Sequence, residues 1–209
     1  MASNYDNSAW FYDPLSKLVY GKALVKAQVY LLQFIQPNTK ILLVGGGTGW
    51  ILEELTRIYP SGLNITYVEI SAKMTALSQK RNIGNNRVIY INNAIENVDL
   101  PNDFDVIITP FLFDNFTGQT LQKVFAHINT VLKPNGIWLN TDFQLTGKWW
   151  QQILLKSMLL FFRIWCNIES KTIINIDPYF NEAGYTVIDD RSFFGEFIIS
   201  KAYKKRLSF

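Results

Sequence analysis

Ile41-Leu42-Leu43-Val44-Gly45-Gly46-Gly47-Thr48-Gly49 joins a run of four apolar residues directly to a glycine-rich segment. The apolar run predicts a fully buried strand, and the spacing of Ile51, Leu55 and Ile58 predicts a helix directly after the glycines. Glycines permit a tight turn and let a ligand lie against the backbone, while free N–H groups at a helix start can face an anion. The segment therefore predicts a ligand-binding turn between a strand and a helix.

Strand-like and helix-like segments alternate on both sides of this turn. A helical region at 14–36 precedes it, and further strands are expected at 65–68, 88–91, 105–109 and 137–141. Helices are expected between them, at 50–59, 72–81 and 119–132. Such alternation predicts a parallel sheet that is covered by helices on both faces.

The end of the chain follows a different pattern. After a long apolar helix at 148–165, two strands at 185–189 and 193–203 are joined only by Asp190-Arg191-Ser192. So short a connection allows an antiparallel pair and excludes a parallel crossover. We therefore expect an α/β fold, with a Rossmann-like, doubly wound, seven-stranded and mostly parallel sheet that ends in an antiparallel C-terminal hairpin.

A carboxylate stands where a nucleoside ribose would bind in such a fold. Glu69 ends the second expected strand, 20 residues after Gly49, and a carboxylate there can accept both ribose hydroxyls. Ile70 follows it and can lie against an adenine face. The spacing G-x-G-x-G differs from the dinucleotide fingerprint G-x-G-x-x-G, because Trp50 occupies the position of its last glycine. The ligand is therefore not expected to be a nicotinamide or flavin dinucleotide.

These residues resemble the motifs of class I S-adenosylmethionine-dependent methyltransferases. Residues 42–49 resemble the first motif of the family, Val68-Glu69-Ile70-Ser71-Ala72-Lys73-Met74 its second, and residues 104–111 the next one. The resemblance covers residues 40–142. It implies that S-adenosylmethionine is the cofactor and that the protein is an enzyme, a methyltransferase.

The resemblance also implies roles for single residues. Gly45, Gly47 and Gly49 would line the methionine part, Glu69 would bind ribose, and the adenine would be flanked by Ile70 and Met74. The adenine amino group would lie beside Asn93-Ala94, with a register that could differ by one residue. The transferable methyl group would lie beside Thr109, Pro110 and Phe111.

Two further points concern the family pattern. Leu43 stands where the first motif commonly has an acidic residue, so backbone carbonyls near Gly45 and Thr109 are expected to hold the methionine amino group instead. Residues 10–21 are similar to the opening of quinone-biosynthesis and phospholipid methyltransferases. In those relatives this region folds over the cofactor, which makes Tyr12 the expected lid residue.

Length and composition limit the other possibilities. The 209 residues predict one methyltransferase domain, with a helical lid region at 1–36, a cofactor-binding core at 37–142, and a substrate-side helix and hairpin at 143–209. With only Cys166 and His127, neither an internal disulfide nor a Cys/His zinc site can form, and no metal is expected. A net charge of +3 does not favour nucleic acid, and the N-terminus has no signal-peptide pattern, so a cytoplasmic protein is expected.

The acceptor side is less specific. If the nucleophile is a hydroxyl or an acidic carbon, a base assists, and Asp114 and Asp142 near the ends of two expected strands are the catalytic candidates. Aromatic residues crowd the segments after the strands, which favours a small apolar acceptor, lipid-like or quinone-like, and peripheral contact with a membrane. A non-catalytic S-adenosylmethionine-binding or regulatory protein and an aminopropyltransferase-like enzyme are the alternatives.

Overall fold

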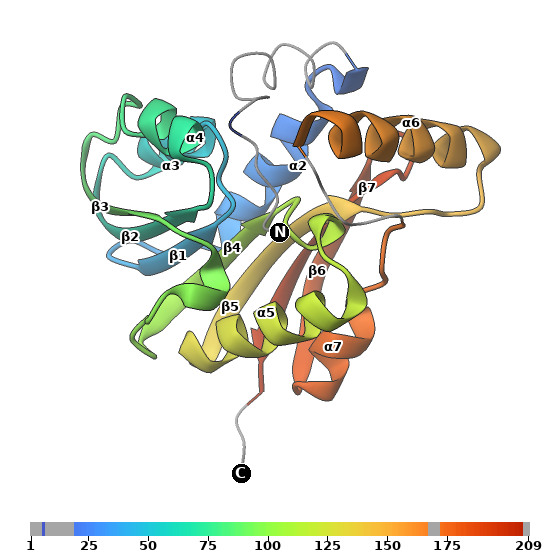
Figure 1. Ribbon diagram of the computed structural model, residues 1–209. Coiled ribbons are helices and arrows are strands. Elements are labelled where there is room, and N and C mark those ends of the chain that lie inside the picture. The colour runs from blue at the N-terminus through green and yellow to red at the C-terminus, as the bar shows by residue number, and fades with distance from the viewer. Residues whose placement is uncertain (1–5, 7–18, 167–171, 207–209) are drawn as a thin grey trace.

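The computed structural model describes residues 6, 19–166 and 172–206, without the side chains at 161, 162 and 164–166. It forms a seven-stranded sheet in the order β3-β2-β1-β4-β5-β7-β6 (Figure 1). The strands are β1 (Lys40–Val44), β2 (Ser61–Glu69), β3 (Asn85–Asn92), β4 (Phe104–Pro110), β5 (Leu132–Phe143), β6 (Tyr185–Phe193) and β7 (Ile198–Lys205). β1 to β5 are parallel, and β7 pairs antiparallel with β5 and β6. The predicted fold class is confirmed.

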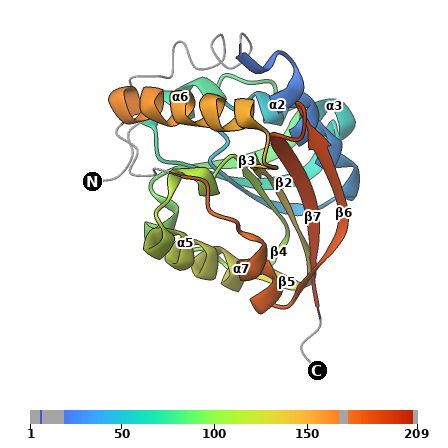
Figure 2. The ribbon, with the colours of Figure 1, turned by 90° about the vertical axis from the view of Figure 1, so that its right-hand side faces the viewer.

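Helices cover both faces of this sheet (Figure 2). They are α2 (Ala23–Leu31), α3 (Trp50–Ile58), α4 (Ala72–Ser78), α5 (Gly118–Val131), α6 (Trp149–Cys166) and α7 (Asp177–Glu182), with short 3-10 turns η1 (Leu32–Phe34), η2 (Ile95–Asn97) and η3 (Phe113–Asn115). Helices α2 and α3 contribute to the core on one face, and α5 and α7 to the core on the other. In the part of the chain that is described, no helix has the length and apolar character needed to cross a membrane.

The side chains of β1 show why the sheet is buried on both faces. Ile41 and Leu43 belong to the core cluster under α2 and α3, whereas Leu42 and Val44 belong to the cluster under α5 and α7. Successive side chains of a strand point to opposite faces, so a strand buried on both sides must be apolar at every position. The unbroken run 41–44 meets this requirement, and it leaves Leu43 in the core.

The position of the C-terminal turn was predicted wrongly. Asp190 lies inside β6 and pairs with Lys201, and the chain reverses instead between Phe193 and Ile198. Three successive residues there, Phe194, Gly195 and Glu196, have positive φ angles of 48°, 58° and 68°. Residues 190–192 are polar because they lie on an exposed edge strand, not because they form a turn.

Other elements also differ from the expected pattern. β2, β3 and β5 extend further toward their N-termini than the apolar runs 65–68, 88–91 and 137–141 suggested, and helix α7 was not expected. A helix of six residues is too short to show an apolar period. The expected N-terminal helix is described from residue 19, so its earlier part, including Tyr12, lies outside the described residues.

Candidate functional site

The glycine loop after β1 has an unusual backbone. Gly45, Gly47 and Gly49 have φ angles of 71°, 61° and 78°, a region that residues with a Cβ rarely adopt. Gly45 N–H donates to the carbonyl of Val68 at 2.9 Å, so the loop begins as a continuation of the β1–β2 pairing. The loop then turns directly into α3, whose first residue is Trp50.

Two side chains of strand β2 form hydrogen bonds with the middle of this loop. The hydroxyl of Tyr67 donates to the carbonyl of Gly47 at 2.7 Å, and Gly47 N–H donates to Oε2 of Glu69 at 3.0 Å. Tyr67 and Glu69 reach the same glycine because alternate residues of a strand point to the same face. Arg81 adds a third contact, donating from Nε to the carbonyl of Thr48 at 2.9 Å.

The four glycines of residues 45–49 have different surroundings. A Cβ at Gly46 would lie 2.4 Å from Leu43 Cδ2, and one at Gly49 would lie 2.4 Å from Ser78 Cβ. At Gly45 the nearest atom would be Leu112 Cδ1, at 3.1 Å. A Cβ at Gly47 would meet nothing closer than Met74 Sδ at 3.9 Å. Packing therefore requires glycine at 46 and 49, whereas Gly47 faces open space in which a ligand can lie.

Glu69 lies at the edge of that open space. Glu69 is only 5% exposed, and its Oε1 accepts the N–H of Ser71 at 2.9 Å. Burial raises the pKa of Glu69, while the N–H groups of Ser71 and Gly47 oppose this rise by stabilising the charged form. A buried carboxylate with two fixed N–H partners is oriented in advance for hydroxyl groups of a ligand.

Asp6 contacts the same region, which the sequence did not indicate. Its Oδ1 accepts the hydroxyl of Ser71 at 2.6 Å and the N–H of Lys73 at 3.1 Å, at the start of α4. The Ser71 hydrogen bond lowers the pKa of Asp6. Asp6 belongs to the lid region expected at 1–36, but 65 residues separate it from Ser71, so no local pattern could have named Asp6 as the contact.

The residues expected around adenine lie near Glu69 along the chain and in the fold. Met74 is buried in α4 and its sulfur faces Gly47, while Ile70 is half-buried directly after Glu69. Ala94 is buried, and its N–H donates a hydrogen bond to Oδ1 of the exposed Asn93 at 2.9 Å. The neighbouring Asn92 Nδ2 instead donates to the carbonyls of Glu69 and Ile70, at 2.8 and 3.0 Å.

The end of β4 combines a closed hydrogen-bond network with backbone strain. Thr109 is fully buried: its hydroxyl donates to Asn140 Oδ1 and accepts from Trp138 Nε1, both at 2.8 Å. Pro110 is buried as well, and Phe111 then adopts a positive φ of 51°. The side chain of Thr109 therefore makes its hydrogen bonds within the core. Only the backbone atoms of Thr109 can contact a ligand.

A second polar point combines the buried Asp142, near the end of β5, with the half-buried Asp114 of η3, just after β4. Asp142 is 5% exposed, its Oδ1 accepts the N–H of Phe143 at 2.9 Å, and its Oδ2 has no hydrogen-bond partner among the described residues. Burial raises the pKa of Asp142 to about 7. Asp114 accepts from Asn115 Nδ2 at 2.8 Å, and its pKa is raised by burial and by the charge of Asp142. The charge of Asp142 therefore disfavours ionisation of Asp114.

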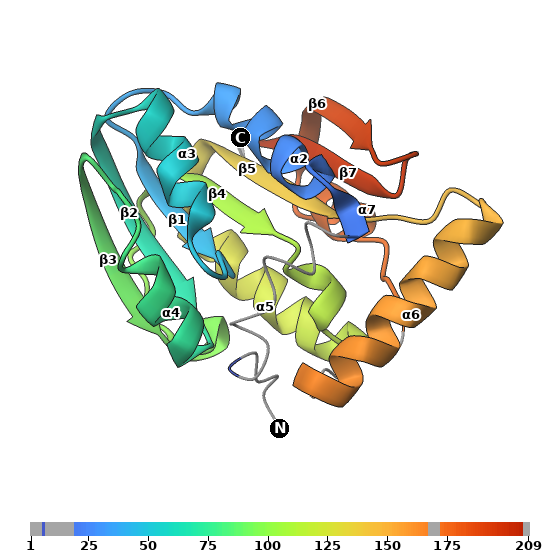
Figure 3. The same ribbon diagram turned by 90° about the horizontal axis from the view of Figure 1, so that it is seen from above.

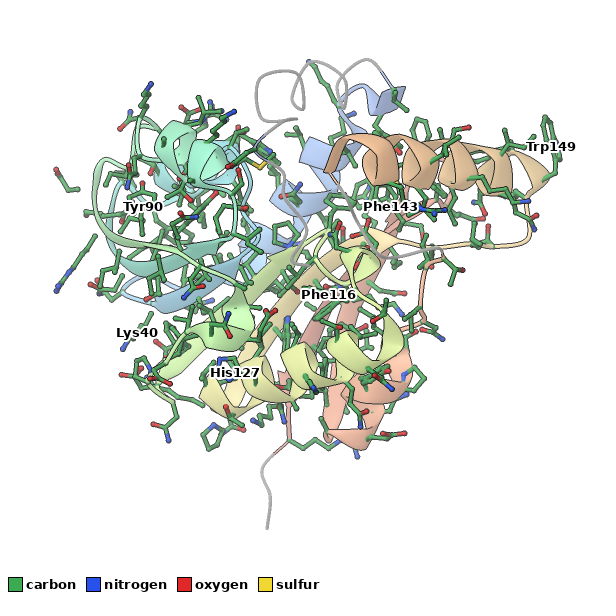
Figure 4. The ribbon with its side chains drawn as sticks, in the orientation of Figure 1. Lys40, Tyr90, Phe116, His127, Phe143 and Trp149 are labelled. Carbon is green, nitrogen blue, oxygen red and sulfur yellow. The ribbon has the colours of Figure 1, made fainter. Side chains whose placement is uncertain are left out.

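An aromatic cluster adjoins these carboxyls. Phe143 packs against Phe111 and Tyr20 with tilted rings, whose centroids are 4.8 and 5.6 Å from its own. Tyr20 donates its hydroxyl to Met158 Sδ at 3.1 Å, and its pKa is raised by burial and by the charge of Asp114. Figure 4 shows Phe143 beneath α6. The sequence predicted an apolar acceptor side but did not indicate Tyr20, because only the folded chain brings it beside Asp114.

The predicted site residues thus form two groups. The first group lies in and around the glycine loop and comprises Gly45, Gly47, Glu69, Ile70 and Met74. The second group lies near the ends of β4 and β5 and comprises Phe111, Asp114 and Asp142. At the start of α6, Trp149 lies at the outer end of the helix and is 74% exposed (Figure 4), whereas Trp150 packs against the cluster that contains Tyr20 and Phe143.

Comparisons with known proteins agree with this arrangement. Residues 41–136 match the family described as a methyltransferase domain. The chain is 34% identical over 95 residues to malonyl-[acyl-carrier protein] O-methyltransferase of Bacillus cereus, covering 44% of this chain and 34% of the relative. It is 35% identical over 111 residues to the ubiquinone/menaquinone biosynthesis C-methyltransferase UbiE of Wigglesworthia glossinidia brevipalpis, covering 51% and 44%.

Solved structures show the same fold at much lower identity. Human N-acetylserotonin methyltransferase in complex with SAM matches with a TM-score of 0.65 at 17% identity, over 88% of this chain and 52% of that chain. The chain spans about a third to a half of the length of five curated relatives that it matches, the two above included. Residues 41–136 thus resemble a methyltransferase domain, and the seven-stranded sheet with its antiparallel end has the fold of the solved methyltransferase above.

Proposed function

We propose that this chain transfers the methyl group of S-adenosylmethionine to a small acceptor with an apolar body, lipid-like or quinone-like. The observation that carries the proposal is the open side of Gly47 beside the buried carboxylate of Glu69. An apolar acceptor is supported by the aromatic cluster of Tyr20, Phe111 and Phe143 next to the two aspartates. Peripheral contact with a membrane fits such an acceptor.

On the cofactor side, the chain's own groups have distinct tasks. The Gly45–Gly49 turn would bring its backbone against the methionine part, because a Cβ at Gly47 would enter the free space. Glu69 would accept the ribose hydroxyls, and Ile70, Met74 and Asn93-Ala94 would enclose the adenine. Residues 37–142 would thus hold the cofactor, and residues 143–209 would complete the acceptor side.

On the acceptor side, the chain must orient the nucleophile, exclude water and accept a proton. The cofactor supplies a methyl group on a sulfonium, which the nucleophile attacks in line as the carbon–sulfur bond breaks. A hydroxyl or acidic carbon loses its proton in this step, and the carboxyls of Asp142 and Asp114 would take it. A base is most effective when its pKa is near the working pH, which fits the raised pKa of Asp142.

The glycine loop gives a first prediction. Gly47→Val should abolish S-adenosylmethionine binding in a protein that remains folded, because its branched side chain would fill the ligand's space. Gly49→Val introduces the same left-handed strain but also meets Ser78 at 2.4 Å, so it should lose thermal stability as well. Calorimetric titration and thermal unfolding of both variants distinguish these effects. Normal cofactor binding by Gly47→Val would refute the assignment.

Glu69 gives a second prediction. Glu69→Ala should weaken S-adenosylmethionine binding about 10- to 100-fold, from the loss of charge-assisted hydrogen bonds worth about 1.5–3 kcal/mol. Glu69→Gln keeps an acceptor oxygen and should lose less. Adenine binding alone should change little in either variant, because that contact is assigned to other residues. An unchanged dissociation constant for the alanine variant would show that the ribose binds elsewhere.

The buried carboxyls give a pH-dependent prediction. Because burial raises the pKa of Asp142 from 3.8 to about 7, the folded state binds more protons than the unfolded state between these values, and stability falls as pH rises from 4 to 7. Asp142→Asn should therefore be more stable than the wild type at pH 8, by about 2–4 kcal/mol, and the gain should shrink toward pH 4.

Urea denaturation at both pH values measures this difference, and the exposed Asp99→Asn serves as the control. The stabilised Asp142→Asn protein should also lose methyl transfer by about 100-fold or more, since a positioned base contributes about 10²- to 10⁴-fold. A pH-independent stability difference would contradict the raised pKa. Full activity in the variant would remove Asp142 from the proposed chemistry.

The reaction itself is tested with methyl-labelled S-adenosylmethionine and a cell extract, with Gly47→Val protein as the blank. We expect label in a small, organic-soluble product. Label in protein or nucleic acid would refute the proposed acceptor class. Cofactor binding without any transfer would favour a binding or regulatory protein. Transfer of the aminopropyl group, followed with a decarboxylated cofactor labelled in that group, would favour an aminopropyltransferase.

A further inference from the structure

The outward side of helix α6 carries the most exposed apolar residues of the described chain. Trp149, Leu160 and Ile153 are 74%, 58% and 57% exposed, and every other large apolar side chain that is described is at most 48% exposed. They recur at positions 149, 153 and 160, which lie along one side of an α-helix. We call the exposed positions of α6 the outer face; they are Trp149, Gln152, Ile153, Lys156, Ser157, Leu160 and Arg163.

This exposure is a fixed property of a well-anchored helix. On the opposite side, Leu155, Met158 and Leu159 are buried in the cluster that contains Tyr20 and Phe143. The helix start is tied to the β6–β7 turn, because Gln151 Nε2 and Lys148 Nζ both donate to the carbonyl of Gly195 at 3.1 Å. The packed side therefore determines which residues the outer face presents.

An apolar groove continues the outer face toward the hairpin. It has a volume of about 510 Å³ and lies between α6 and the β6–β7 turn, with Trp149, Trp150, Ile153, Leu154 and Phe194 among its lining residues. Figure 3 shows α6 extending along the side of the molecule. The exposed apolar surface is thus continuous and accessible to a large partner.

The charges on this face are all positive. Lys156 and Arg163 lie between and beyond the exposed apolar residues, and residues 143–168 contain no Asp or Glu. Long basic side chains can keep their charge in a polar layer while their stems cover apolar surface. In a two-fold dimer this face would meet its own copy, with cations against cations and no acidic partner. An anionic lipid bilayer, with an apolar interior and negative head groups, complements this face better than a second copy of the chain would.

We propose that the outer face of α6 is a membrane-docking surface that binds anionic lipid bilayers, with the helix lying in the plane of the interface. Trp149, Ile153 and Leu160 would enter the acyl boundary, and Lys156 and Arg163 would contact the head groups. Since α6 follows β5 directly, docking would turn the ends of β4 and β5 toward the lipid. The proposal goes beyond methyl transfer and does not depend on it.

The test is cosedimentation of the full chain with vesicles of phosphatidylcholine alone and of phosphatidylcholine mixed with phosphatidylglycerol. The wild type should bind the mixed vesicles and should bind more weakly at high salt. Ile153→Gln with Leu160→Gln should weaken binding about tenfold or more, and Lys156→Gln with Arg163→Gln about fivefold for each charge. S-adenosylmethionine binding should be unchanged in every variant, which separates this test from the proposed function.

A matched control is available on the hairpin. Val187→Gln with Ile188→Gln removes two apolar side chains of β6 that are 48% and 45% exposed, and should leave vesicle binding intact. Equal loss in this control, or no binding of the wild type to mixed vesicles, would overturn the proposal. So would a wild-type dimer in sedimentation velocity that the Ile153 and Leu160 substitutions dissociate, because the face would then belong to a second copy.

Discussion

Strand β2 hydrogen-bonds both the N–H and the carbonyl of Gly47, and the candidate site is built around this contact. The Tyr67 hydroxyl donates to the carbonyl and the Glu69 carboxylate accepts the N–H, so the loop cannot shift without breaking two partly buried hydrogen bonds. A buried group left without its partner costs about 1–3 kcal/mol. The left-handed φ angles of the loop are thus maintained by the strand beside it, and the open side of Gly47 keeps its position relative to Glu69.

At the other end of the site, a buried carboxyl has fewer hydrogen-bond partners than Glu69 has. Glu69 has two fixed N–H partners, whereas Oδ2 of Asp142 has no partner among the described residues and lies close to a second carboxyl. Burying a carboxylate without full compensation destabilises the fold. Strain is also present nearby, in the positive φ of Phe111. Unfavourable features of this kind gather where a fold serves chemistry rather than stability.

Much of the cofactor side could be predicted because its signals are local. The strand 41–44, the glycines and Glu69 follow one another at spacings that strand geometry sets, and the family motifs repeat them. The acceptor side could be predicted only as apolar, with Asp114 and Asp142 as candidate bases. Tyr20 meets Asp114 and Met158 across more than 90 residues, and Asp6 meets Ser71 across 65, and no periodicity within a segment encodes such contacts.

The sequence by itself determined the alternation of strands and helices and the glycine turn, because each rests on a local pattern of residues. The antiparallel end of the sheet was also predicted, but from a connection that lies inside β6. Tertiary structure alone decided where the hairpin turns, since residues 190–192 resemble a turn but pair along β7. It also decided which apolar residues of α6 are buried. Trp149 and Leu159 look alike in an apolar run, but the packing of the helix on one side buries Leu159 and leaves Trp149 in solvent.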